Sequence, residues 1–214
     1  MKLRISNLYT AMALAATLSL CHALAEDKSS ASDAKAGKPK EGDAPNMAEM
    51  MKNMEAAATP GPAHKVLDSL AGEWNITARF WMAGPDGPPM ESKGTVTSRW
   101  VLGGRFLQEE VSSEMMGKPF QGMGLTGYDN MKKKYVNVWA DSMGTSLTTC
   151  QGSADAAGKV ITYEGKMDEP MTGEKDKPFK YILRIESPDK HILEMHDPTR
   201  GEKSKMGEIT YTRK

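Results

Sequence analysis

From Gly72 onward, apolar and polar residues alternate along the chain. In the first run, every second position is apolar: Trp74, Ile76, Ala78, Phe80 and Met82. A period of two is typical of a strand that buries one face. Nine further short runs follow, over residues 93–101, 105–113, 122–128, 135–141, 146–152, 160–166, 179–186, 191–196 and 205–212. The pattern therefore predicts about ten strands.

The connections between these runs are short and rich in turn residues, among them Gly103-Gly104, Asp129-Asn130 and Ala157-Gly158. Short connections require neighbouring strands to be antiparallel. Ten such strands in one domain either stack as a sandwich or close as a barrel. We favour an all-β, closed or nearly closed antiparallel meander barrel, because closure removes exposed strand edges.

Ahead of the strands the apolar period changes from two to 3.6. Met47, Met50, Met51 and Met54 follow the spacing i, i+3, i+4, i+7, which predicts an amphipathic helix at about 47–58. A methionine face of this kind is typical of an adaptable contact surface, for the barrel or for a partner. Thioethers also bind Cu(I), so a copper site stays open as the alternative. A second short helix is expected over residues 62–70, with Pro62 in its first turn and Gly72 after its end.

The N-terminal 25 residues have the pattern of a secretory signal peptide. Lys2 and Arg4 precede an apolar stretch, and Ala23-Leu24-Ala25 is a small-x-small cleavage site. We expect cleavage at about Ala25 and a periplasmic or secreted protein, with lipidation at Cys21 as the less favoured alternative. Residues 26–45 have the composition of a disordered linker. The predicted organisation is a signal peptide (1–25), a linker with the methionine helix (26–58) and a barrel domain with a leading short helix (62–214).

Composition narrows the class of partner. The chain has 28 basic and 28 acidic residues, and removal of Lys2 and Arg4 leaves 26 against 28, a net charge of −2. This balance gives no support for a nucleic-acid partner, which usually requires a basic excess. No stretch after the signal peptide is long and apolar enough to span a bilayer, so we do not expect an integral membrane protein. There are 17 methionines, and Cys150 is the one cysteine outside the signal peptide.

Four spaced motifs carry a resemblance to a known family. They are Pro62-x-His64-x-x-Leu67-x-x-Leu70-x-Gly72-Glu73-Trp74, then Arg99-Trp100-Val101-Leu102-Gly103-Gly104-Arg105-Phe106-Leu107, then Gly127-Tyr128-Asp129, and last Tyr135-Val136-x-Val138-Trp139-x-Asp141-x-x-Gly144-Thr145. In this order, over about residues 63–214, the chain resembles the bacterial domain-of-unknown-function family 1579. The resemblance implies an exported, lipocalin-like (calycin-type) barrel without an established activity.

The candidate ligand-binding residues lie in or beside these motifs and are Trp74, Arg99, Glu109, Tyr128, Trp139 and Asp141. The resemblance implies that Trp74 closes one end of the barrel. Arg99 and Glu109 flank the Gly103-Gly104 turn on adjoining strands and are expected to form an interior polar pair. Trp139 and Asp141 are two residues apart, so they share one face of a strand.

The sequence contains no recognisable catalytic motif. No serine lies in a Gly-x-Ser-x-Gly elbow, and no carboxylate pair stands out, so we predict no catalytic residue and no cofactor. His191 and His196 are five residues apart and point to opposite faces of one strand, so they do not share a metal. The leading hypothesis is a barrel that binds a small apolar or amphipathic molecule. The alternatives are a non-catalytic envelope interaction module with a filled barrel, and an uncharacterised enzyme or a copper or haem binder with His196 as an axial ligand.

Overall fold

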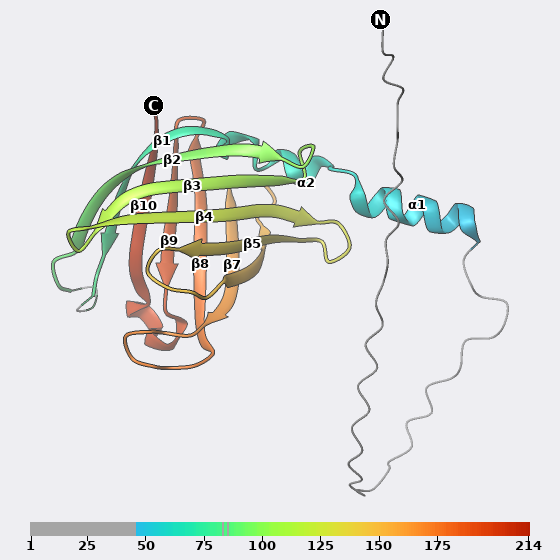
Figure 1. Cartoon of the computed structure of the whole chain (residues 1–214). Helices are drawn as coiled ribbons and strands as arrows, with labels where there is room; N and C mark the ends of the chain where they lie inside the picture. Colours follow the sequence, from blue (N-terminus) through green and yellow to red (C-terminus); the bar gives the residue numbers. More distant parts are fainter. Residues whose placement is uncertain (1–45, 83, 85) are drawn as a thin grey trace, which may run out of the picture. The chain divides into compact units, whose positions relative to one another are not determined.

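The computed structural model describes residues 46–82, 84 and 86–214, and the predicted signal peptide and most of the linker lie outside these residues. Ten antiparallel strands form a closed barrel in which β1 pairs with β10 and every other strand pairs with its neighbours along the chain (Figure 1). The strands are β1 (Gly72–Phe80), β2 (Met90–Val101), β3 (Phe106–Met115), β4 (Lys118–Asp129), β5 (Lys134–Asp141), β6 (Thr148–Ala154), β7 (Val160–Met167), β8 (Lys177–Ser187), β9 (Lys190–His196) and β10 (Lys205–Arg213). The expected ten-stranded antiparallel barrel is confirmed.

Alternation along each strand decides which side chains fill the interior. On β1, Trp74, Ile76 and Ala78 are buried, whereas Asn75 between them and Glu73 and Arg79 on either side of them are exposed. The buried side chains form two apolar clusters, one around Leu107, Ile161 and Leu183 and the other around Trp74, Val96 and Tyr211. Burial of these apolar side chains is the main contribution to the stability of the barrel.

Residues 62–70 close one end of the barrel. They form α2 (Pro62–Lys65) and the 3-10 helix η1 (Asp68–Leu70), and Leu67 and Leu70 are buried in the interior. Their backbone is fixed by side chains of the barrel: Trp74 Nε1 donates to the carbonyl of Leu70, and the Tyr135 hydroxyl donates to that of Ala63. We call residues 62–70 the plug and the end of the barrel that they close the plug end. The opposite end, where the β1–β2 and β7–β8 loops lie, is the mouth.

Helix α1 (Met47–Ala58) covers the range that the methionine spacing predicts. Asn46 caps its start by accepting a hydrogen bond from the Glu49 amide, and all twelve residues are exposed. At its other end, Nδ2 of Asn130 in the β4–β5 turn donates to the carbonyls of Ala56, Ala57 and Thr59. The expected packing of the methionine face on the chain's own barrel is therefore not seen.

None of the described helices is long and apolar enough to cross a membrane.

Candidate functional site

A carboxyl group lies among the apolar side chains inside the barrel. Glu109 of β3 is paired in register with Ser98 of β2 on one side and with Gly124 of β4 on the other. The hydroxyl of Tyr211 donates to its Oε1 across 3.4 Å. Burial raises the pKa of the Glu109 carboxyl to about 7, although the hydrogen bond from Tyr211 lowers it in part. At neutral pH the group is therefore divided between its neutral and charged forms.

A buried phenol, that of Tyr163, lies near this carboxyl. Tyr163 of β7 is 4% exposed, and its hydroxyl is buried and unpartnered among the described residues. Burial is the main cause that raises its pKa, and Cys150, Tyr135 and Glu109 add to this. A buried hydroxyl without a partner costs about 1–3 kcal/mol. Such a group indicates a position at which a bound molecule or water completes the structure.

Trp139 and Asp141 of β5 lie on the same face as Glu109. The indole Nε1 of Trp139 donates to Oδ2 of Asp141 over 2.9 Å, and the amide of Met143 donates to Oδ1. The indole lies over Gly122 and Gly124, where a Cβ would come within 2.3 Å and 3.2 Å of the ring. In the register, Gly124 of β4 lies between Glu109 of β3 and Trp139 of β5. Since glycine has no side chain, the Trp139 ring has room beside the Glu109 carboxyl. We call Glu109, Tyr163 and Tyr211, with Trp139 and Asp141, the interior polar centre.

Cys150 lies next to this centre and carries a buried thiol. Its thiol is free and buried, 4.0 Å from Oδ1 of Asn137, and burial raises its pKa to about 12. The thiol is therefore protonated at neutral pH, whereas nucleophilic attack requires the thiolate.

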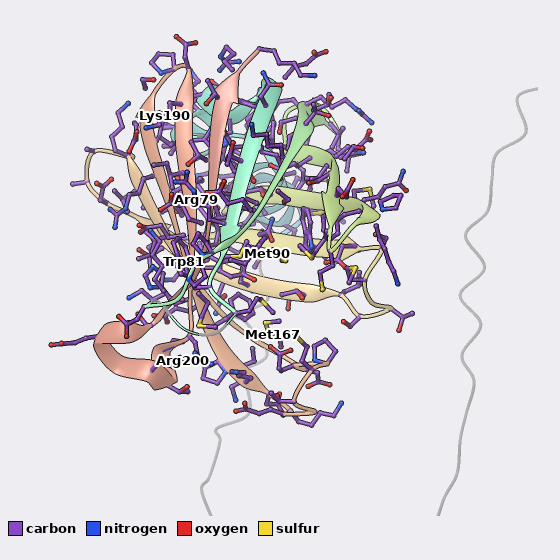
Figure 2. All side chains as sticks on the ribbon, turned by 90° about the vertical axis from the view of Figure 1, so that its left-hand side faces the viewer. Arg79, Trp81, Met90, Met167, Lys190 and Arg200 are labelled. Carbon is purple, nitrogen blue, oxygen red and sulfur yellow. The ribbon has the colours of Figure 1, made fainter. Side chains whose placement is uncertain are left out.

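Large apolar side chains of intermediate exposure mark the mouth. By strand alternation the inward positions at this end are Phe80, Met90, Met115, Phe120, Met167 and Met195. Figure 2 shows Met90 and Met167 toward one end of the barrel and Lys190, which belongs to the plug end, at the other. Methionine has three rotatable bonds and adapts to irregular shapes. The mouth is therefore apolar and deformable, in contrast to the plug, where Leu67 and Trp74 are fully buried.

The structure contradicts the predicted interior pair of Arg99 and Glu109. Arg99 is opposite Gln108 in the β2–β3 register, whereas Glu109 is opposite Ser98. Residues opposite each other share a face, so the two side chains point to opposite sides of the sheet. Arg99 is exposed and binds Glu110 instead, with 2.7 Å between its Nη2 and the carboxylate Oε1.

Trp74 and Tyr128 lie at the plug and not at the interior polar centre. Trp74 is fully buried under the guanidinium of Arg213, whose Cζ is 4.2 Å from the ring centroid. Tyr128 contacts His64 and Tyr135 edge to face. The closure of one barrel end by Trp74 agrees with what the resemblance implies.

The two histidines of β9 point to opposite faces, as their spacing predicts. His191 is buried, and its ring stacks on Tyr211 with 4.1 Å between centroids. Burial, assisted by Arg213, lowers its pKa to about 3, so it is neutral near pH 7. His196 is on the outer face, where its Nδ1 lies 3.0 Å from Oγ of Ser204. An interior haem ligand at His196 is therefore wrong. The described residues contain no group of three or more His, Cys, Asp or Glu side chains that could hold a metal ion.

Nothing in the sequence singles out Tyr163 or Tyr211 as site residues. Both lie in runs that the pattern identifies as strands, but a tyrosine on a strand carries no signal of its own. Knowledge of the register would have placed Tyr211 on the inward face with Trp74 and Ile76.

Residues 59–213 match the family described as "Protein of unknown function (DUF1579)". The chain belongs to this family. Among solved structures, this DUF1579 protein is similar to Rv2717c from M. tuberculosis, with 18% identity and a TM-score of 0.51, over 73% of this chain and 99% of that one. It also matches a redesigned β-barrel, b11L5F_LGL, with 16% identity and a TM-score of 0.36, over 73% and 99% of the two chains. The likeness to Rv2717c concerns the fold alone. No curated protein sequence matches the chain.

Proposed function

We propose that this DUF1579 protein binds one small amphipathic molecule inside its barrel. The observation that carries the proposal is the buried Tyr163 hydroxyl, which has no hydrogen-bond partner in the described part of the chain, in an interior that also holds the Glu109 carboxyl. Barrels of this size can enclose one small ligand. The molecule enters at the mouth, because the plug blocks the other end.

The side chains define the chemistry of the ligand. Its apolar part contacts the methionine and phenylalanine side chains of the mouth. Its polar end is an uncharged oxygen-bearing group, such as a hydroxyl or carbonyl, which accepts a hydrogen bond from Tyr163. The carboxyl of Glu109, with a pKa of about 7, both donates and accepts hydrogen bonds near neutral pH. A permanently anionic head group is disfavoured, because it would be buried beside the charged form of Glu109.

The proposal includes export. The charged start, the apolar stretch and the Ala23-Leu24-Ala25 site support secretion to the periplasm or beyond, with cleavage at about Ala25. A barrel that encloses an apolar molecule would carry it through an aqueous compartment.

The test is native mass spectrometry of the protein purified from the cells that produce it, followed by solvent extraction of any bound molecule. We expect an adduct that is lost in Glu109→Gln and Tyr163→Phe. Glu110→Gln is the matched control, because Glu110 is the neighbouring carboxylate and lies exposed on the outer face. The control should retain the adduct.

A second measurement uses N-phenyl-1-naphthylamine, a neutral fluorophore, as an apolar probe. We expect a fluorescence increase that the extracted molecule reverses by competition. A protein without an adduct that also leaves the probe fluorescence unchanged contradicts the proposal.

A further inference from the structure

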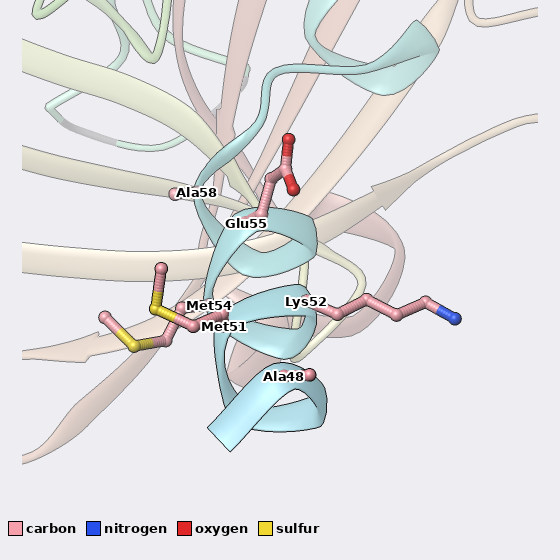
Figure 3. Close-up of a pocket in the computed structure, with 6 residues that line it drawn as sticks. All are labelled: Ala48, Met51, Lys52, Met54, Glu55 and Ala58. Carbon is pink, nitrogen blue, oxygen red and sulfur yellow. The ribbon is translucent and has the colours of Figure 1, made fainter. Parts of the chain in front are cut away.

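Helix α1 presents an apolar face that none of the described residues covers. Met47, Met50, Met51 and Met54 are 72%, 46%, 61% and 67% exposed. Figure 3 shows Met51 and Met54 on one side of the helix and Lys52 on the other. An isolated helix of 12 residues is marginally stable in water, so this one needs a contact to persist.

The outer face of β4 and β5 carries a second uncovered apolar surface. It consists of Met123, Leu125, Val136, Val138 and Ala140, which we call the β4–β5 patch. Leu125 is opposite Val138 and Met123 is opposite Ala140, so the side chains form adjoining pairs on one face. Met123, Leu125 and Val138 are 50%, 37% and 38% exposed. A groove of about 590 Å³ runs from the patch over the outer face of β2 and β3.

The connection of α1 to the barrel separates these two surfaces within one chain. Asn130 binds the last carbonyls of α1 while every residue of the helix stays exposed. The hydrogen-bonded helix therefore does not lie on the patch of its own barrel. On a second copy, the same patch is within reach of the methionine face of α1, and the hydrogen bonds between Asn130 and α1 stay intact.

We propose that α1 of one copy packs its methionine face on the β4–β5 patch of a second copy, and that the contact is reciprocal. The lengths agree, because a 12-residue helix is about 18 Å long and the five residues from Val136 to Ala140 span about 17 Å. A twofold exchange uses both surfaces of each copy and so doubles the buried apolar area. Glu49, Lys52 and Glu55 give the helix a slight acidic excess, which favours this partner over an anionic membrane surface.

The test is sedimentation velocity of the purified chain at roughly 10–500 µM, the range in which a small interface associates. We expect a dimer for the wild type and a monomer both for the double variant Met50→Glu/Met54→Glu and for Val138→Glu. Met171→Glu is the control, because Met171 is 69% exposed but lies in the β7–β8 loop, outside both surfaces. It should leave the dimer unchanged. Leu125→Lys provides a second patch variant if Val138→Glu unfolds.

A mixture of the helix variant and the patch variant separates exchange from other pairings. In a reciprocal exchange, the intact helix of Val138→Glu meets the intact patch of Met50→Glu/Met54→Glu, so the mixture regains part of the association. A dimer that survives Val138→Glu and Leu125→Lys indicates pairing of helix with helix and overturns the proposal. A wild type that is monomeric over the whole range also overturns it, including the case in which α1 covers its own patch.

Discussion

Glu109 and His191 make opposite contributions to the pH dependence of stability. The pKa of Glu109 is raised from 4.5 to about 7 by burial, so its contribution to folding is present below pH 4.5 and is lost as the pH rises through 7. The pKa of His191 is lowered from 6.5 to about 3, so its contribution is present above pH 6.5 and is lost as the pH falls. Between pH 4.5 and 6.5, a rise in pH therefore lowers the free energy of unfolding through Glu109 and raises it through His191.

The variant Glu109→Gln removes the pH dependence of stability that is due to Glu109. Relative to the wild type, its free energy of unfolding should rise by about 3 kcal/mol between pH 4.5 and 7, since one pKa unit corresponds to about 1.4 kcal/mol. Urea unfolding at five pH values measures the difference. Parallel pH profiles of variant and wild type would show that Glu109 ionises as it does in the unfolded chain.

The variant His191→Phe removes the pH dependence of stability that is due to His191. It keeps an aromatic ring against Tyr211 and Trp74 but cannot take up a proton. As the pH falls from 6.5 to 4.5, the free energy of unfolding should decrease less in the variant than in the wild type. The difference between the two should be about 1.4 kcal/mol per pH unit. Thermal unfolding over this range is the measurement, and an unchanged acid slope would contradict the neutral buried state of His191.

Tyr163→Phe separates ligand binding from folding. Removal of a buried hydroxyl without a partner should stabilise the empty barrel by about 1–2 kcal/mol. The same variant should bind the extracted molecule less tightly. Tyr135→Phe is the contrast, because its hydroxyl donates to the Ala63 carbonyl and its loss should destabilise the barrel. A loss of stability in Tyr163→Phe would show that the hydroxyl has a partner.

At the scale of the elements, hydrophobic alternation identified all ten strands because each buries one face. The prediction of their ends was less accurate. Strand β4 begins at Lys118, four residues before the predicted start at Gly122, because its backbone pairing with β3 continues as far as Met115. The pattern also could not give the register. A shift of one residue exchanges the two faces, which is why Arg99 was placed inside beside Glu109.

Close approach of strands explains a glycine that the sequence pattern leaves unexplained. A Cβ on Gly152 of β6 would lie 2.1 Å from the Thr162 carbonyl oxygen of β7, and neither backbone can move without breaking the sheet. We expect Gly152→Ala to lower the free energy of unfolding by more than 2 kcal/mol. In Gly144→Ala, where the nearest atom is 3.9 Å from the added carbon, the change should be below about 0.5 kcal/mol. Chemical denaturation of both variants is the measurement, and equal effects would contradict this account.

At the scale of the whole molecule, Arg213 joins the last strand to the plug. Its guanidinium donates to the carbonyls of Ser69, Ala71 and Pro188, and it lies over the ring of Trp74. Hydrogen bonds from a charged group contribute about 1.5–3 kcal/mol each. Arg213→Gln should therefore lower the free energy of unfolding by about 3 kcal/mol or more. Hydrogen exchange should show the loss of protection at residues 62–70 first.

Arg99→Gln is the matched control for this prediction, because Arg99 forms an exposed ion pair with Glu110. Such pairs contribute about 0–1 kcal/mol. Equal destabilisation by the two substitutions would show that Arg213 does not hold the plug. The sequence contains no sign of this role, since the Ser69 and Ala71 carbonyls that Arg213 binds at the plug are backbone atoms far away along the chain.

The pairing of β1 with β10 has a consequence for how the barrel forms. The other nine pairings join neighbours along the chain and close short loops, whereas this one joins Trp74 to Arg213 across almost the entire domain. Local contacts form fast and distant ones slowly. During synthesis, β1 and β9 keep open edges until the nine residues of β10 arrive, so the barrel is most exposed to edge-to-edge aggregation just before β10 is made.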